Sequence, residues 1–152
     1  MNYLNTEENR KSVIELFPGL EGDERFEVNS PNDNKYNCLA FAASRTDRFW
    51  WPAIADGCFW PLDDLSTEFN NLILAYETVG YQLCDSWEFD PKLKKIALYV
   101  DDNNQFTHAS RQLRIGLWTS KLGQAFDIIH GTPYTIEGDV YGKVGAFMSA
   151  IY

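Results

Sequence analysis

Cys38 and His108 are the two residues of this chain whose types and positions are most suited to chemistry. Cys38 follows Asn37, a good helix N-cap, and precedes a run of small and apolar residues at 39–43. A helix N-terminus and a nearby imidazole both favour the thiolate, which is the nucleophilic form of cysteine. The pair therefore predicts a Cys38 nucleophile with His108 as its base. The alternative is a buried structural cysteine and a satisfied core histidine.

The residues after His108 offer candidates for a third catalytic group. A tight connection near 113–116 would place His108 opposite Ser120 or the next residue of the following strand, where a hydroxyl would fix the imidazole tautomer. Asp127 would orient His108 from further away, although a surface carboxylate is the simpler interpretation. His130 is the alternative base if His108 is buried.

Other residues would complete a site around the thiol. Asn37 is a candidate oxyanion donor, beside the backbone N–H of the cysteine itself. Trp51 and Trp60, each followed by proline, would wall a substrate groove, or alternatively anchor a loop or the core. Cys58 and Cys84 have no cap or charged neighbour that would activate them, so we expect both to be structural.

Composition excludes several classes of protein. The chain has 152 residues, 45% of them hydrophobic, and a formal net charge of −9, which fit one globular domain over 1–152. This charge disfavours binding to nucleic acid or to an anionic membrane surface. Three cysteines without C-x-x-C spacing and only two histidines predict no metal site, and no cofactor is implied. The polar N-terminus predicts a cytoplasmic protein, or one exported without an N-terminal signal.

The pattern of elements predicts an α+β fold, with N-terminal helices packed on a C-terminal antiparallel sheet. On the second strand, alternation would place Phe106, His108 and Ser110 on one face, with Thr107 and Ala109 on the other. We expect helices at 6–17, 38–45 and 69–79, the last capped by Ser66 or Thr67; a loop at 21–35; strands at 96–100, 106–110, 117–120 and 141–152; and a helical turn at 124–130.

Motifs along most of the chain resemble an uncharacterised family of small bacterial proteins. The matching segments are NCLAFA (37–42), WP (51–52), WP (60–61), GY (80–81), THASRQL (107–113), WTSKLG (118–123), DIIH (127–130) and YG (141–142). This resemblance implies a bacterial source and no particular activity.

The cysteine helix and the strands after it resemble, more distantly, papain-like and NlpC-type cysteine hydrolases. Those enzymes cleave peptides, amides or isopeptides, and some transfer acyl groups, so the resemblance implies a papain-like topology with Cys38 as nucleophile and His108 as base. In the NlpC-type pattern the histidine begins the first strand of the meander, where this chain has Lys95 and Ile96.

Two functions follow from these observations. One is a cysteine hydrolase or acyl transferase that acts on an amide, peptide or thioester. The other is a non-catalytic acidic module, an inhibitor or immunity-type factor on a papain-like fold, that binds a basic protein partner through its net charge of −9.

Overall fold

The computed structural model describes residues 3–31, 36–45, 48–122 and 126–152. Its helices are α1 (Glu7–Leu16), α2 (Cys38–Ala42) and α3 (Phe69–Glu77), and two 3-10 turns are η1 (Pro18–Gly22) and η2 (Pro133–Ile136). Its strands are β1 (Glu27–Ser30), β2 (Phe49–Trp50), β3 (Cys58–Phe59), β4 (Gln82–Cys84), β5 (Leu93–Val100), β6 (Phe106–Gln112), β7 (Trp118–Lys121), β8 (Asp127–His130) and β9 (Lys143–Ile151).

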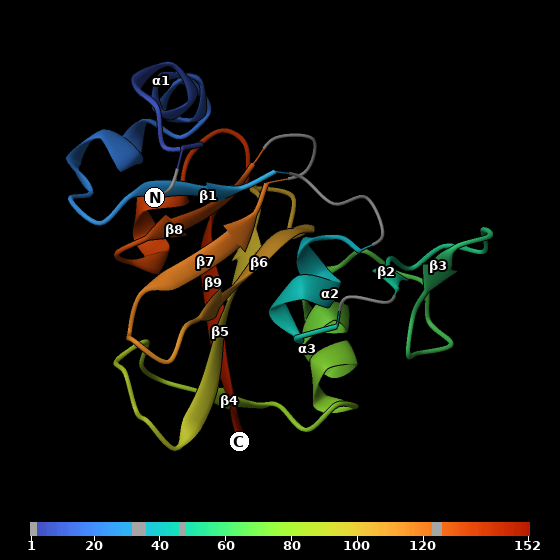
Figure 1. Cartoon of the computed structure of the whole chain (residues 1–152). Coiled ribbons are helices and arrows are strands. Elements are labelled where there is room, and N and C mark those ends of the chain that lie inside the picture. Colours follow the sequence, from blue (N-terminus) through green and yellow to red (C-terminus); the bar gives the residue numbers. More distant parts are fainter. Residues whose placement is uncertain (1–2, 32–35, 46–47, 123–125) are drawn as a thin grey trace.

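One sheet organises the molecule. Seven strands lie in the order β1-β8-β7-β6-β5-β9-β4, and every neighbouring pair is antiparallel. The short strands β2 and β3 form a separate parallel pair at the edge of the molecule, beyond α2 (Figure 1). Helices and a mostly antiparallel sheet confirm the α+β class.

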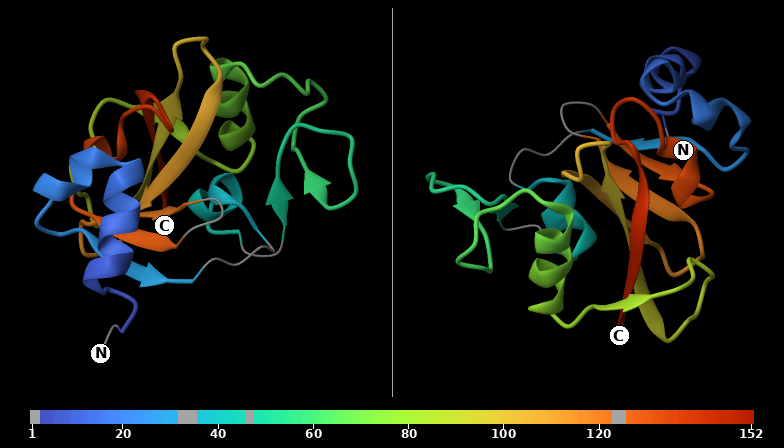
Figure 2. Two further views of the ribbon diagram at one scale, coloured as in Figure 1. Left: turned by 90° about the horizontal axis from the view of Figure 1, so that it is seen from above. Right: turned by 180° about the vertical axis from the view of Figure 1, so that it is seen from behind.

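Two buried clusters lie on the two faces of this sheet. Strand β5 contributes to both, because Ile96 and Leu98 point to one face and Ala97 and Tyr99 to the other. The first cluster, here the α3-side core, also contains buried residues of α2 and α3. The second, the α1-side core, contains residues of α1, η1, β7 and β8. Both views in Figure 2 show α1 on the opposite side of the sheet from α2 and α3.

The helix predictions are largely confirmed. Thr6 caps α1, its Oγ1 accepting from the N–H of Asn9 at 3.1 Å. The predicted caps of α3 are wrong, because the N-cap residue is Glu68 and makes no side-chain cap. Gly80 follows the helix with φ of +96°, a conformation that suits glycine.

Two segments differ from the prediction. The expected loop at 21–35 contains β1, whose Val28 is fully buried and which pairs with β8. The expected helical turn begins at Gln124, outside the described residues, and its described remainder is strand β8. Pairing with β7 on one side and β1 on the other holds this short segment extended, and local pattern carried no sign of either partner. The sheet therefore includes a strand that precedes α2.

The predicted faces of β6 are only partly right. His108 and Ser110 share a face, but Phe106 belongs to the α3-side core together with Ala109. The register between β5 and β6 shifts between Tyr99 and Val100, and such a bulge reverses the alternation beyond it.

The described helices include none that is long and apolar enough to cross a membrane.

Candidate catalytic site

Asn37 fixes the start of α2 and hence the position of Cys38. Its Oδ1 accepts from the N–H groups of Ala40 at 3.2 Å and Trp50 at 3.0 Å, and its Nδ2 donates to the Trp50 carbonyl at 2.6 Å. The first of these bonds is the expected N-cap. The other two attach the helix to β2, so the side chain predicted as an oxyanion donor is committed to holding the backbone.

The Cys38 thiol is partly exposed but closely surrounded by protein atoms. Burial raises its pKa from the ordinary value of 9.0 to about 11, because the charged form is poorly solvated. Backbone groups of Ala109, Leu39 and Cys38 itself, together with the charge of Lys121, lower the pKa and offset part of this rise. At neutral pH the resting protein therefore holds a thiol, and a nucleophilic Cys38 needs a base.

A buried polar chain crosses three strands of the sheet. His108 on β6 and His130 on β8 both bond the hydroxyl of Ser120 on β7, with Nε2–Oγ distances of 3.1 and 2.9 Å respectively. Nδ1 of His130 bonds the carbonyl of Thr132 at 2.8 Å. The predicted contact between His108 and Ser120 is therefore present, and Ser120 is completely buried.

Hydrogen-bond chemistry fixes which group donates and which accepts along this series of polar groups. A carbonyl only accepts, so Nδ1 of His130 carries the proton and its Nε2 accepts from the Ser120 hydroxyl. The Ser120 oxygen then accepts from Nε2–H of His108. A neutral imidazole carries one proton, so Nδ1 of His108 holds a free lone pair. Within the described structure this buried nitrogen has no hydrogen-bond partner.

Aromatic rings enclose His108. The Tyr141 ring stacks on the imidazole with centroids 4.0 Å apart and an interplanar angle of 7°, and the Tyr99 ring lies 5.3 Å away. Burial, followed by the charge of His130, holds the pKa of His108 well below its usual 6.5. Burial also lowers the pKa of His130 to about 4, against a smaller opposing effect of the Thr132 carbonyl. Both imidazoles are neutral at pH 7.

Cys38 packs on the α3-side core, whereas His108 shares the opposite face of the sheet with Tyr99, and in the described structure the two are linked only through neighbouring residues. A backbone group of Ala109, the residue after His108, lowers the pKa of the thiol. Burial and, to a smaller extent, the Cys38 thiol raise the pKa of Tyr141, whose ring stacks on the imidazole. The pairing of β6 with β7 begins at Arg111. Before Arg111, the edge of β6 that faces β7 is not paired with that strand, and β6 is contacted by α2. Because Nδ1 of His108 is unpartnered, no hydrogen bond joins thiol and imidazole in this state.

The predicted acid of the site contacts other groups. Asp127 Oδ2 accepts from the hydroxyl of Ser30 at 3.0 Å, and Oδ1 lies 3.8 Å from Nζ of Lys121. Lys121 is buried and its ammonium lies 5.1 Å from the centroid of the Tyr36 ring. Asp127 thus neutralises the lysine whose charge acts on the Cys38 thiol, while Ser120 and His130 occupy the positions behind His108.

The two tryptophans predicted for a groove pack against one ring. Trp51 meets Phe106 edge-on with centroids 5.4 Å apart, and Trp60 stacks on it at 5.8 Å. Nε1 of Trp60 donates to the carbonyl of Asp64 at 3.1 Å. Phe106 is buried in the α3-side core, so these contacts match the anchoring role given above as the alternative.

In the part of the chain that the structure describes, the remaining cysteines and possible metal ligands form no cluster. Cys58 and Cys84 are free and partly exposed, and the sulfur of Cys84 lies 3.6 Å from the Ser86 carbonyl. Among the residues that the structure describes, no group of three or more His, Cys, Asp or Glu side chains is arranged to hold a metal ion.

Sequence reasoning missed the contribution of His130 as the partner of Ser120, and of Tyr141 as the ring on His108. A signal for His130 exists, because Ser120 and His130 lie on facing strands and on the same face once β8 is recognised. Tyr141 lies outside the regular strands, and local pattern gives no indication of its contact.

The chain was compared with proteins already described. Neither the curated proteins nor the solved structures gave a match. A family model described as "Domain of unknown function (DUF7689)" matches residues 27–149, a span that includes Cys38, His108, Ser120, His130 and Tyr141. Because this match covers most of the sequence, the chain belongs to that family of unknown function.

Proposed function

We propose that this protein is a cysteine hydrolase or acyl transferase acting on an amide, peptide or thioester, with Cys38 as nucleophile and His108 as base. The observation that carries the proposal is the lone pair on Nδ1 of His108. It is buried and unpartnered next to the strand residue whose backbone lowers the pKa of the thiol, while Nε2 is tied through Ser120 and His130 to a backbone carbonyl. A buried acceptor without a donor costs stability, so its retention favours a functional role.

The reaction begins with a neutral thiol and a neutral imidazole. As the Cys38 sulfur attacks the carbonyl carbon, its proton passes to Nδ1 of His108, and the carbonyl electrons move onto oxygen. Collapse of this intermediate breaks the bond to the amine or thiol, which leaves with the proton from Nδ1. Water, or an acceptor nucleophile, then gives its proton to Nδ1 and attacks the Cys38 thioester, and the sulfur regains a proton as it leaves.

The surrounding residues have distinct roles in this scheme. Ser120 and His130 are positioning residues, because they hold the His108 tautomer without touching the substrate. The backbone N–H groups of Cys38 and Leu39 at the start of α2 are the candidate oxyanion donors, because the Asn37 amide is occupied and the N–H of Ala40 is bonded to it. The transfer requires the thiol to approach Nδ1, a contact that often tightens only when substrate binds.

The order of a cysteine on an early helix and a histidine on a later antiparallel strand supports the papain-like topology that we propose for this fold. The departure from the NlpC-type pattern persists, because His108 lies on β6 rather than on the preceding strand β5.

Acylation by p-nitrophenyl acetate tests the proposal. We expect a burst of p-nitrophenolate and an acetyl group located on Cys38 by peptide mass spectrometry. The matched controls are Cys58→Ser and Cys84→Ser, which replace the other two, partly exposed thiols. Both should keep the burst, because the proposal assigns the His108–Ser120 pair to Cys38 alone. Equal labelling of all three cysteines, or a burst retained in Cys38→Ser, would falsify the proposal.

A non-catalytic binding module is the second candidate. The pKa of about 11 for the thiol and the complete burial of His108 favour it, as does the net charge of −9 for a basic protein partner. The acylation experiment separates the two candidates, since a binding module has no reason to acylate Cys38 selectively.

A further inference from the structure

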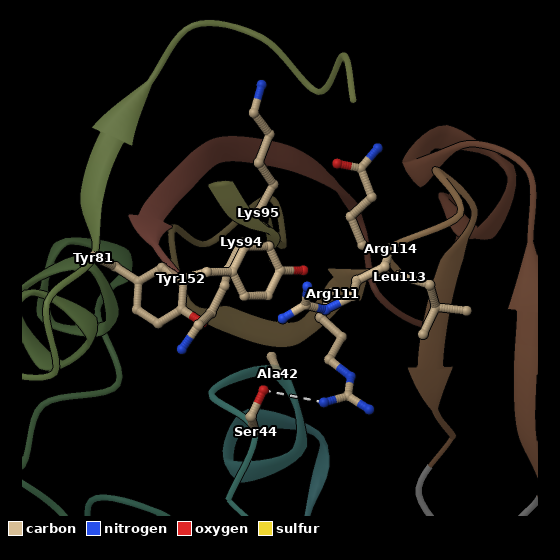
Figure 3. Close-up of a pocket in the computed structure, with 10 residues that line it drawn as sticks. Ala42, Ser44, Tyr81, Lys94, Lys95, Arg111, Leu113, Arg114 and Tyr152 are labelled. Atoms are coloured by element: carbon tan, nitrogen blue, oxygen red, sulfur yellow. Dashed lines mark hydrogen bonds between the residues drawn. The ribbon is translucent and has the colours of Figure 1, made fainter. Parts of the chain in front are cut away.

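A basic cavity of about 270 Å³ lies beside the C-terminal end of α2 (Figure 3). Its lining includes Lys94 and Lys95 of β5, Arg111 of β6 and Arg114 of the following turn, four of the thirteen Lys and Arg residues of the chain. None of the described residues that line it contributes a carboxylate side chain. The local charge is thus opposite to the net charge of −9.

Aromatic rings hold three of these cations without neutralising them. The Arg114 guanidinium carbon lies 3.8 Å from the centroid of the Tyr152 ring, and Nζ of Lys94 lies 5.9 Å from the same centroid. The Arg111 guanidinium carbon lies 4.4 Å from the centroid of Phe41. Cation–π contacts restrict side chains but leave their full positive charge available to an anion.

Arg111 has hydrogen-bonding capacity to spare. One terminal nitrogen donates to the Ser44 hydroxyl at 3.1 Å, whereas its buried Nε has no partner within the described structure. Burial lowers the pKa of Arg111, and the more distant Asp127 has a smaller, opposite effect. Asp127 contacts Lys121 and Ser30 and does not line the cavity.

The fourth cation is turned elsewhere. Lys95 is buried, donates to the carbonyl of Ser86 at 2.9 Å, and extends away from Arg111 and Ser44 in Figure 3. The same view shows Lys94, Arg111 and Arg114 around the Tyr152 ring. These three residues, from two neighbouring strands and a turn, are the available charges.

We propose that this cavity binds a small molecule through a terminal oxyanion, a phosphate or carboxylate group, held by Lys94, Arg111 and Arg114. Guanidinium groups match both oxyanions with paired N–H donors, and an ammonium adds a further charge. Ser44 supplies a hydroxyl on the α2 side, and Tyr152 offers a ring to the rest of the ligand. The site is independent of the proposed cysteine chemistry.

Titration calorimetry with pyrophosphate and with citrate, in a low-salt buffer free of phosphate, tests this site. We expect one of these anions to bind, with an affinity that falls as NaCl is added. Arg114→Gln and Lys94→Gln should each weaken binding roughly tenfold, because each removes a charged contact. Binding of pyrophosphate alone identifies a phosphate ligand, and binding of citrate alone a carboxylate ligand.

The matched control is Lys92→Gln, which removes the same charge from an exposed residue just before β5 that does not line the cavity. It should leave the affinity within about twofold of the wild type. Cys38→Ser should also bind normally, which separates this site from the proposed catalytic one. Absence of binding by both anions, or an equal loss in Lys92→Gln, overturns the proposal.

Discussion

His108 and Arg111 lie on the same strand, β6, but the side chains around them differ in charge. Around His108 the polar groups are buried, neutral and bonded in a chain from Ser120 to the Thr132 carbonyl. Around Arg111 three cations gather against aromatic rings, and none of the described lining residues contributes a carboxylate side chain. Two residues of β6, Ala109 and Ser110, separate His108 from Arg111.

The difference follows from which side chains can lose their charge. A buried histidine or cysteine becomes neutral at little cost, so burial leaves His108 and Cys38 uncharged at pH 7. An arginine stays charged in proteins, so a partly buried guanidinium keeps its need for an anion. In our proposals the His108 region transfers protons and the Arg111 region binds an anion.

Replacing the proposed base, His108, should have the largest effect. We expect His108→Gln to slow acylation of Cys38 by p-nitrophenyl acetate roughly 1,000-fold, because the thiol then has no base. Ser120→Ala should slow it less, since His108 remains but its tautomer is no longer fixed. Stopped-flow absorbance gives both rates. A His108→Gln variant that folds, shown by circular dichroism, and acylates at the wild-type rate would contradict the role of His108.

Acid should destabilise the protein through the buried histidines. The folded-state pKa of His130 is about 4 and the unfolded value is near 6.5, so between these pH values the unfolded chain binds more protons. The stability that depends on a neutral His130 is therefore fully present above about pH 6.5 and is lost as the pH falls towards 4. The contribution of His130 is about 3 kcal/mol in the free energy of unfolding, and His108 adds in the same direction.

Urea unfolding followed by tryptophan fluorescence between pH 7.5 and 4.5 measures this loss. His130→Gln keeps a donor and an acceptor near Ser120 but cannot titrate, so its stability should depend less steeply on pH. An equally steep dependence in this variant would show that other groups control the acid transition.

Alkali should act through the Cys38 thiol with the opposite sign. Its folded pKa of about 11 lies above the ordinary 9.0, so the folded chain binds more protons between these values. Stability is complete below about pH 9 and falls as the pH rises towards 11, by about 2 kcal/mol for this group. The comparison of wild type with Cys38→Ala, both unfolded in urea at pH 8 and pH 10, isolates the effect. An alkaline slope in Cys38→Ala equal to that of the wild type would contradict this assignment.

The smallest effect is expected in the basic cavity without its ligand. Arg114 is exposed and contacts the Tyr152 ring, so Arg114→Gln loses one cation–π contact and relieves repulsion from Lys94 and Arg111. These changes oppose each other, and we expect stability within about 0.5 kcal/mol of the wild type. Thermal unfolding at low and high salt measures it. A large loss of stability would assign these cations to the fold rather than to a ligand.

The site was predictable where local chemistry determines the answer. An asparagine before a run of small residues starts a helix, and Asn37 caps α2 as expected. Two neighbouring antiparallel strands joined by a short turn bring their residues together, and this placed Ser120 beside His108. The α+β class followed from the change of periodicity after Gly80.

Other features depended on contacts between distant segments. The four residues of β1 and of β8 carry too little pattern to specify a strand, and they are extended because they pair with each other. Because of the bulge near Val100, Phe106 lies on the other face of β6 from His108. Local alternation indicates neither this reversal nor the stacking of Tyr141 on His108.

The sequence by itself determined the candidate residues, the helix that begins at Cys38 and the class of the fold, because capping and periodicity act within a few residues. Only the tertiary structure decided the ionisation of those residues. Burial raises the pKa of Cys38 and lowers that of His108, and the hydroxyl between two imidazoles fixes which nitrogen keeps its lone pair. Desolvation and hydrogen bonding depend on everything that surrounds a group in space, and most of those neighbours are remote in the chain.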